Sequence, residues 1–277
     1  MDCSSFTPDL SDAQFGRICR LLFDQCGISL RPGKEALVRS RLGRRLNRLG
    51  LDSFDRYMEL VESGESGDEL RAMVDALTTN KTSFFREAEH FHYLMTHLLP
   101  RLCADDRPLR FWSAGCSTGE EPYTLAIVLR EAIPQWEQHD CRILATDISD
   151  RVLEEARRGV YAPDRLENVP AEYLTRYFHG AAGGKAPAYE VREKLRSVVR
   201  FARLNLMDPW PMKGPFDAIF CRNVMIYFEL ATRQELVRRF ARLLAPGGHL
   251  FVGHSESLTQ SFPEIGYVQP AVYVKKA

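Results

Sequence analysis

The sequence predicts an α/β protein with a mainly parallel sheet, preceded by an all-α domain at the N-terminus. From Ser11 to Leu77, apolar residues recur at the spacing of helices. From Leu109 onward, short runs rich in β-branched and aromatic residues alternate with helical segments, which is typical of a parallel sheet with crossover helices. We therefore predict a helical domain at residues 1–80 and an α/β domain at residues 81–277.

Regularly placed stop signals predict four helices in the first domain. Gly27 follows the first helix, Pro32 and Gly33 precede the second, and Gly50 ends the second. Asp52 and Ser53 can cap the third. The expected helical segments are those around Phe15–Leu22, Leu37–Leu49, Phe54–Val61 and Asp68–Leu77.

Four strands are expected first in the second domain, with helices after the first, second and fourth. They are Leu109–Ser113, Arg142–Asp147, Val198–Arg203 and Phe216–Cys221. Pro246 to Gly248 is expected to turn the chain into a strand at His249–Val252. Tyr267–Val274 is expected to be the last strand, with a hairpin-like pair at the end of the chain. A polar stretch at about 161–197 containing the Gly180–Gly184 run interrupts this alternation, and we predict a small inserted subdomain there.

Composition limits the class of protein. Lys plus Arg and Asp plus Glu both number 37, so the formal net charge is zero and no global field favours nucleic acid. The start of the chain has neither the basic nor the apolar part of a signal peptide, and no stretch approaches the roughly 18 apolar residues of a membrane span. The seven cysteines contain no C-x-x-C pair and the histidines no H-E-x-x-H. We expect a cytoplasmic protein with reduced thiols, no metal and no membrane insertion.

The segment from Ser113 to Pro122 carries the main chemical signal. Gly115 and Gly119 follow the first strand, and Pro122 is expected at the first position of a helix. The glycines fit neither the G-x-x-x-x-G-K-[ST] loop nor the G-x-G-x-x-G fingerprint. The segment also has two carboxylates and no cation, which disfavours phosphate and favours a sulfonium or ammonium ligand. The loop therefore predicts an S-adenosylmethionine site.

Polar residues after the next two strands fit the same cofactor. Asp147 ends the second strand, where a carboxylate can accept hydrogen bonds from both ribose hydroxyls. The alternative is that Asp147 caps the following helix. Asn205 and Leu206 follow the third strand, and they offer an amide and an apolar face to adenine.

Two near-matches to other catalytic motifs are rejected. Gly253 to Ser257 resembles the hydrolase G-x-S-x-G elbow, but no histidine follows Ser255 to complete a triad. Asp208 to Pro211 resembles the D-P-P-Y motif of nucleic-acid amino-methyltransferases, but it precedes the fourth strand instead of following it. Neither segment therefore indicates a hydrolase or a nucleic-acid amino-methyltransferase.

Four separated motifs, in order, resemble the bacterial chemotaxis receptor methyltransferase family (CheR). They are Thr79–Arg86, Ser113–Tyr123, Phe216–Phe228 and Gly253–Ser257, and the resemblance extends from about Ser11 to the C-terminus. It implies a Rossmann-like fold of the class I methyltransferase type with the small inserted subdomain. It also implies a protein-glutamate O-methyltransferase that uses S-adenosylmethionine, releases S-adenosylhomocysteine, and acts on the cytoplasmic domain of membrane chemoreceptors during adaptation. In this family the inserted subdomain can dock on a receptor tether, for which this chain offers no residue-level match.

The resemblance also implies roles for particular residues. Arg86 and Tyr227 would lie nearest the transferred methyl group, although a core aromatic is the alternative for Tyr227. A glutamate with a pKa of about 4.3 is already ionised near neutrality, so the reaction needs positioning and no general base. The residues expected to contact the cofactor are Asn80, Thr82, Arg86, Glu120, Asp147, Asn205, Leu206, Arg222 and Asn223.

A basic segment in the helical domain is a candidate for substrate docking. Between Lys34 and Arg48, Glu35 is the only acid, and the candidate docking residues are Arg39, Arg41, Arg44, Arg45 and Arg48. The alternative is a solvated helix face. Three other functions stay open from the residues alone: a small-carboxylate O-methyltransferase, a non-catalytic adaptor that senses S-adenosylmethionine or a nucleotide, and a nucleic-acid methyltransferase.

Overall fold

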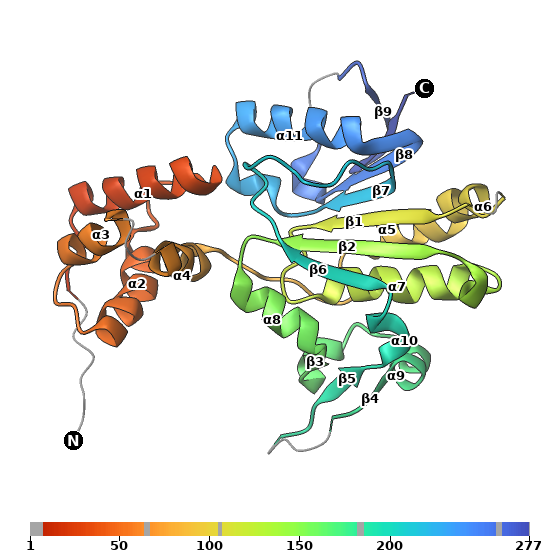
Figure 1. Ribbon diagram of the computed structural model, residues 1–277, viewed down its shortest axis with the longest axis horizontal. Coiled ribbons are helices and arrows are strands. Elements are labelled where there is room, and N and C mark those ends of the chain that lie inside the picture. Colours follow the sequence, from red (N-terminus) through yellow and green to blue (C-terminus); the bar gives the residue numbers. More distant parts are fainter. Residues whose placement is uncertain (1–7, 64–66, 105–106, 182–185, 259–261, 277) are drawn as a thin grey trace. The chain divides into compact units, whose positions relative to one another are not determined.

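The structure is a computed structural model that describes residues 8–63, 67–104, 107–181, 186–258 and 262–276. The chain divides into two compact units (Figure 1). The first comprises Met1–Thr79 with Tyr227–Glu229, and the second comprises Asn80–Ile226 with Leu230–Ala277. Each unit is described by itself.

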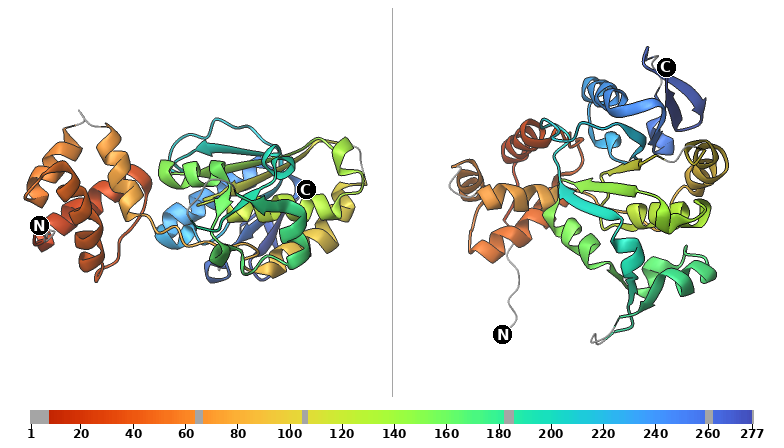
Figure 2. Two further views of the ribbon diagram at one scale, coloured as in Figure 1. Left: turned by 90° about the horizontal axis from the view of Figure 1, so that it is seen from below. Right: turned by 45° about the vertical axis from the view of Figure 1, so that its right-hand side comes forward.

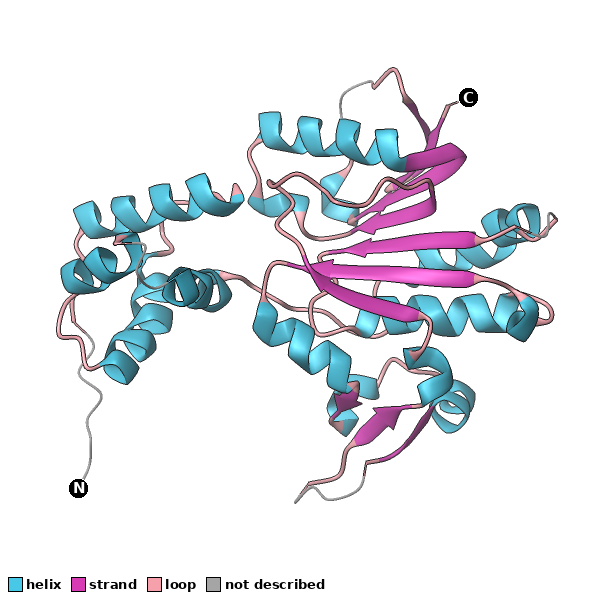
Figure 3. Cartoon of the chain, viewed as in Figure 1, coloured by secondary structure: helices cyan, strands magenta, loops and turns pink. Residues whose placement is uncertain are grey.

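The first unit is built from helices (Figure 3). A capping box at Ser11 starts the first helix, and left-handed Gly27 and Gly50 end the first and second. Ser53 caps the third. These caps confirm the predicted helices, which are α1 (Asp12–Cys26), α2 (Glu35–Leu49), α3 (Phe54–Glu62) and α4 (Gly67–Leu77). An isolated bridge between Ile28 and Phe228 joins the Tyr227–Glu229 segment to them.

The second unit contains a seven-stranded sheet in the order β6-β2-β1-β7-β8-β10-β9 (Figure 1). The first five strands pair in parallel: β6 (Val199–Arg203), β2 (Cys141–Asp147), β1 (Leu109–Ala114), β7 (Phe216–Cys221) and β8 (Leu244–Val252). The last two, β10 (Val272–Lys275) and β9 (Ile265–Gln269), pair antiparallel at one edge, as the dark blue strands of Figure 2 show. The predicted mainly parallel α/β fold is confirmed.

Three predicted boundaries were wrong. The strand expected at Tyr267–Val274 is two strands, because Ala271 takes a left-handed conformation (φ 62°) and reverses the chain. The turn expected before His249 lies inside β8, where the pairing with β7 is irregular. The helix α7 (Glu120–Ala132) begins directly after left-handed Gly119, so Pro122 is its third residue and not its first. One further helical run was not expected from the sequence: α5 (Ala88–Tyr93), η1 (Leu94–Leu98) and α6 (Leu99–Leu102).

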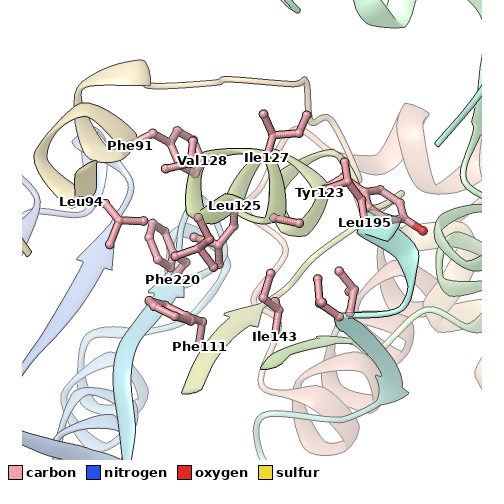
Figure 4. Close-up of a cluster of buried hydrophobic side chains, with 14 of the residues drawn as sticks. Phe91, Leu94, Phe111, Tyr123, Leu125, Ile127, Val128, Ile143, Leu195 and Phe220 are labelled. Atoms are coloured by element: carbon pink, nitrogen blue, oxygen red, sulfur yellow. The ribbon is translucent and has the colours of Figure 1, made fainter. Parts of the chain in front are cut away.

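Helices cover both faces of the sheet. On one face, Phe111, Ile143 and Phe220 of the strands pack with side chains from α7, α5 and η1 (Figure 4). On the opposite face, Trp112 of β1 meets Phe240 of α11 (Leu230–Leu243), with ring centroids 5.2 Å apart. Burial on both faces explains why the β7 sequence Phe216–Cys221 is continuously apolar apart from Asp217.

The predicted insertion forms a small antiparallel sheet in the order β3-β5-β4, between α8 (Asp150–Arg158) and β6 (Figure 1). Its elements are β3 (Val160–Tyr161), η3 (Pro163–Leu166), α9 (Ala171–Tyr177), β4 (Phe178–Gly180), β5 (Tyr189–Val191) and α10 (Glu193–Arg196). Much of the predicted glycine-rich run lies outside the described residues. Of the seven cysteines, Cys3 also lies outside them and the other six are free thiols, as expected. Among the described residues, no helix combines the length and the apolar composition that spanning a lipid bilayer requires.

Candidate active site

The carboxyl ends of three neighbouring parallel strands, β1, β2 and β7, form one edge of the sheet, where open α/β sheets bind ligands. The loop after β1 folds onto β2 at this edge: the amides of Gly115 and Cys116 donate to the carbonyl of Thr146 at 2.8 and 2.9 Å. Gly115 has φ 87°, and a Cβ there would overlap the side chain of Val224, which follows β7. The Val224 side chain therefore fills the space that a side chain at position 115 would need, and the loops after β1 and β7 are in contact there.

Asp147 joins this loop to the end of β2. Its carboxylate accepts the amide of Ser117 at 2.8 Å and the amide of Ser149 at 3.0 Å. The helix-cap alternative for Asp147 was wrong, because Ser149 occupies the cap position of α8 and accepts the amide of Val152. The Ser117 hydroxyl donates to the carbonyl of Asn80 at 2.9 Å. Two residues expected at the cofactor, Asp147 and Asn80, thus both bind Ser117, one at its amide and the other at its hydroxyl.

The two adjacent glutamates of the loop point to different partners. Glu120 is completely buried, and it accepts the Thr118 hydroxyl at 2.7 Å and pairs with Arg165 of the inserted segment. Glu121 accepts the Ser113 hydroxyl at 2.7 Å and pairs with Arg222 at 3.1 Å. Burial raises the pKa of both carboxyls, against the opposing influence of these partners. Of the two, it is Glu121 that meets another residue predicted at the cofactor.

Arg222 is the centre of a buried charge cluster. Its side chain is 2% exposed, and its guanidinium lies 3.1 Å from Glu87 and 3.1 Å from Glu121. It also donates to the carbonyl of Arg86. Burial by itself raises the pKa of Glu87, but Arg222 and Asn223 together hold that pKa below its ordinary value. The cluster fixes a cation at the end of β7 with carboxylates on two sides.

Asn223 has an uncommon backbone conformation, and the buried Glu256 holds it there. Its φ is 58°, its amide donates to Glu256 at 2.7 Å, and its side-chain nitrogen donates to Glu87 at 3.3 Å. Glu256 also accepts the amides of Ile226 at 2.9 Å and Gly253 at 2.6 Å. Burial raises the pKa of Glu256, while these backbone bonds favour its charged form. The rejected Gly253–Ser257 motif therefore contributes a structural acid and no nucleophile.

Arg86 lies in a strained turn between Phe85 (φ 52°) and Glu87 (φ 54°). The amide of Phe85 donates to the Thr124 hydroxyl of α7 at 3.1 Å. Arg86 donates to the carbonyl of Lys81 at 2.8 Å, and its Nε lies 4.0 Å from Glu87. Its side chain is 36% exposed, so the guanidinium is accessible although the turn around it is anchored. The Thr82 hydroxyl forms no hydrogen bond with any described residue.

The predicted adenine segment is held by its own turn. The side chain of Asn205 accepts the amide of Met207 at 3.1 Å and donates to Asp208 at 3.1 Å. The carbonyl of the buried Leu206 accepts from Arg239 at 2.6 Å. Just before this turn, the amide of Leu204 donates to the carbonyl of Asp147 at 2.9 Å. The turn therefore lies beside the predicted ribose residue.

Tyr227 belongs to the first unit, whereas the other predicted cofactor and methyl-site residues belong to the second. Its carbonyl accepts the amide of Ser29 at 2.8 Å, and its hydroxyl lies 3.4 Å from the carbonyl of Thr79. The core position in this segment is taken by Phe228, which is buried, while Tyr227 is only partly buried. A core aromatic therefore describes Phe228 better than Tyr227.

The arginines of α2 divide into structural and exposed groups. Arg41 donates to the carbonyls of Ala76, Leu77 and Thr78 at the end of α4. Arg45 pairs with the buried Glu69, which also accepts the Tyr57 hydroxyl at 2.8 Å. Arg39 pairs with Asp9 at 2.8 Å. Arg44 and Arg48 are exposed and make no ion pair with any described residue.

One cluster has the residue types of a metal site. Ligand atoms of Glu87, His90 and His254 lie within 4.8 Å of one another. However, Glu87 already binds the guanidinium of Arg222, and burial together with Arg222 lowers the pKa of His90 to about 3. A second cation beside Arg222 would be repelled, so we assign the cluster to the Arg222 ion pairs. The expected absence of a metal stays a prediction.

Three acids of the site, Glu121, Glu87 and Glu256, are absent from the contacts predicted from the sequence, and the last two lie outside the predicted loop. Glu87 follows directly after the Thr79–Arg86 motif, and Glu256 lies inside the Gly253–Ser257 motif. Their partners are 135 and 33 residues away in the chain, so spacing alone could not indicate the contacts. Their position inside or next to a matched motif was the one available signal.

Comparisons with known proteins cover nearly the whole chain. The family model described as CheR methyltransferase, all-alpha domain, matches residues 13–78, and the one described as CheR methyltransferase, SAM binding domain, matches residues 80–271. The chain is 43% identical to the "Chemotaxis protein methyltransferase" of Salmonella typhimurium strain LT2 over 95% of this chain and 90% of that protein. It is 45% identical to the "Chemotaxis protein methyltransferase" of Escherichia coli strain K12, over 90% of this chain and 86% of that protein. It is 44% identical to "Chemotaxis protein methyltransferase 2" of Pseudomonas aeruginosa strain PAO1, over 94% of this chain and 91% of that protein.

Proposed function

Because the chain belongs to the CheR methyltransferase family, we propose that it methylates glutamate side chains in the cytoplasmic domain of chemoreceptors. The methyl donor is S-adenosylmethionine, and the products are glutamate methyl esters and S-adenosylhomocysteine. The family match over both units is the observation that carries this proposal, and it agrees with the resemblance found in the four motifs. A small-carboxylate methyltransferase and a non-catalytic adaptor have no comparable support. A cytoplasmic location follows from this proposed substrate.

The residues at the sheet edge have the chemistry that the cofactor needs. Asp147 offers carboxylate oxygens for ribose hydroxyls, and the Asn205–Leu206 turn beside it suits adenine. We assign the contact with the positively charged part of the cofactor to Glu121 instead of Glu120. A hydrogen-bond acceptor must be reachable by its ligand, and Glu120 is completely buried by protein. The remaining proposed contacts are Asn80, Thr82, Arg86, Arg222 and Asn223.

The chemical step requires orientation more than acid–base catalysis. The cofactor supplies an electrophilic methyl group on a sulfonium, and a glutamate with a pKa of about 4.3 is ionised near neutral pH. Arg86 is accessible and held by a strained turn, so it can orient that carboxylate by a single contact. A tight bidentate pair would reduce the carboxylate's nucleophilicity. Alignment of the reacting groups can lower the barrier by several kcal/mol, up to about 7–11 in the best cases.

We propose that substrate docking uses the exposed basic residues of α2. All five arginines were candidates in the sequence, but Arg41 and Arg45 are committed to contacts inside the helical unit. Arg44 and Arg48 are the best candidates, because their charges face solvent. A basic helix face complements a glutamate-bearing substrate.

The decisive experiment is the identification of the bond that holds the transferred methyl. The protein is incubated with radiolabelled S-adenosylmethionine and membranes that contain chemoreceptors, and the labelled receptor is then treated with mild base. We expect receptor label that base releases, as from a carboxyl methyl ester. Receptors whose modifiable glutamates are replaced by alanine are the control. Base-stable label would indicate N-methylation and contradict the proposal.

A variant tests the role of the predicted methyl-site tyrosine. Tyr227→Phe removes only the hydroxyl, so the packing of Phe228 and the backbone bond to Ser29 should persist. We expect normal affinity for S-adenosylmethionine by calorimetry and loss of most methyl incorporation. Unchanged incorporation would remove the Tyr227 hydroxyl from the mechanism.

A further inference from the structure

The inserted segment holds the cofactor loop through two side chains. Tyr161 of β3 donates its hydroxyl to the carbonyl of Thr118 at 2.7 Å, and Arg165 of η3 donates to the Thr118 hydroxyl at 2.8 Å. Arg165 also pairs with the carboxylate of Glu120. Thr118 and Glu120 flank Gly119, which has φ 96° and ends the loop. Both ends of the loop's last turn are therefore bound from the insertion.

Close packing accompanies these polar contacts. A Cβ on Gly119 would lie 2.8 Å from the Tyr161 hydroxyl and 2.9 Å from the Cβ of Ala156. Tyr161 is buried and meets Phe84 edge to face, with centroids 5.0 Å apart. Phe84 belongs to the same motif as Asn80 and Arg86, so one tyrosine contacts two of the segments predicted to bind the cofactor.

The two charged partners, Glu120 and Arg165, differ in how deeply they are buried. The Glu120 side chain is 0% exposed, whereas Arg165 is 37% exposed. A buried carboxylate that loses its counter-charge must take up a proton or move, and either change costs free energy. Thr118 donates to Glu120 at 2.7 Å, so any movement of Glu120 would be transmitted to the loop. The Ser113–Pro122 segment contains no cationic residue, so the loop itself offers Glu120 no counter-charge.

We propose that Arg165 is a positioning residue for S-adenosylmethionine: it supplies the counter-charge that holds Glu120 and Thr118, and through them the loop, in the conformation that binds the cofactor. Arg165 acts from the inserted segment and does not itself contact the cofactor. The insertion is then part of the cofactor site's support, and anything that moves η3 changes affinity for the methyl donor. This role rests on the cofactor alone and not on the identity of the methyl acceptor.

The test is a double-mutant cycle on the full-length protein, with the dissociation constant for S-adenosylmethionine measured by calorimetry. We expect Arg165→Met to raise this constant about tenfold, equivalent to about 1.4 kcal/mol, because it leaves Glu120 buried and unpaired. In a Glu120→Gln background the same change should raise it less than about twofold, because a neutral amide needs no counter-charge. Arg165→Lys should restore most of the affinity.

A matched control separates this role from simple anchoring of the insertion. Arg176 of α9 pairs with Glu131, so it too joins the inserted segment to α7, but near the opposite end of that helix. Arg176→Met should leave the dissociation constant within about twofold of wild type, because its partner Glu131 lies far along α7 from the loop and is not completely buried. Equal weakening by Arg165→Met in both backgrounds, unchanged affinity in Arg165→Met, or equal weakening by Arg176→Met would overturn the proposal. None of these measurements uses a receptor, so their failure is distinct from failure of the proposed glutamate methylation.

Discussion

At the scale of single residues, Arg222 is a buried cation between Glu87 and Glu121, so the stability of the fold should depend strongly on its charge. Arg222→Met would leave Glu121 without its cation and Glu87 with only Arg86, whose Nε lies 4.0 Å away. We expect the free energy of unfolding to fall by about 3 kcal/mol or more. Urea denaturation followed by tryptophan fluorescence measures this loss.

The matched control for Arg222 is an exposed pair in the same unit. Arg151 and Glu155 lie one turn apart on α8, 2.8 Å from each other, with side chains 56% and 34% exposed. Arg151→Met should change the free energy of unfolding by less than about 0.5 kcal/mol. Similar losses in the two variants would show that burial does not distinguish the pairs.

A second residue-scale prediction concerns His249, whose ring is buried beside the Tyr93 hydroxyl, 3.1 Å away. Burial lowers the pKa of His249 to about 4, against about 6.5 in an unfolded chain. Between these values the unfolded state binds more protons, so stability falls as the pH drops. The loss from pH 7 to pH 5 is about 2 kcal/mol for this group.

The pH experiment compares wild type with His249→Gln, which cannot titrate. The free energy of unfolding of wild type should fall by about 2 kcal/mol more than that of the variant between pH 7 and pH 5. Taking the difference removes the contributions of His90 and of the buried carboxyls, which both proteins share. Parallel pH profiles would contradict the lowered pKa of His249.

At the scale of elements, α2 carries a prediction about substrate recognition. Reversing the charges of Arg44 and Arg48 to glutamate should raise the apparent KM for receptor about tenfold at low salt, because both side chains face solvent. The affinity for S-adenosylmethionine should not change. Steady-state kinetics with receptor membranes measures the first quantity and calorimetry the second. An unchanged KM would leave α2 as a solvated surface.

Arg45 shows why the choice of residues on α2 matters. It pairs with the buried Glu69, so Arg45→Glu would place two carboxylates together inside the helical unit. That variant should unfold more easily, and any effect on KM would then have two causes. The double variant at Arg44 and Arg48 avoids this ambiguity.

The sequence predicted elements best where a local signal marked their ends. As expected, the first two helices end at left-handed Gly27 and Gly50, and the third begins after the cap at Ser53. The run α5–η1–α6 was missed because it lacks such signals: it starts without a side-chain cap and contains a π-helical turn. The Arg222 cluster was only partly predictable, since its acids are brought together by the sheet and not by spacing in the chain.

At the scale of the whole molecule, the two units can be observed separately. All three tryptophans, Trp112, Trp136 and Trp210, lie in the second unit, so their fluorescence reports that unit alone. S-adenosylmethionine at 100 times its dissociation constant should raise the free energy of unfolding seen by tryptophan by about 2.7 kcal/mol. Urea titrations with and without the cofactor measure this shift. No shift would mean that this unit does not bind the cofactor when folded.

The division into units was also the part of the architecture least accessible to sequence reasoning. The sequence indicated a boundary near residue 80, where the texture of the chain changes. It gave no sign that Tyr227–Glu229 is grouped with the helices, because that grouping depends on the bridge between Ile28 and Phe228 and on the bond from Ser29 to Tyr227. Contacts of this kind join segments about 200 residues apart.

The three amides that share Glu256 have a spectroscopic consequence. The amide protons of Gly253, Asn223 and Ile226 all point to one carboxylate, although they belong to two different loops. In an NMR spectrum their resonances should therefore respond together to any change at that carboxylate, and their exchange with deuterated solvent should be slow. If the three signals shift together, they would report that the loops after β7 and β8 move together during turnover.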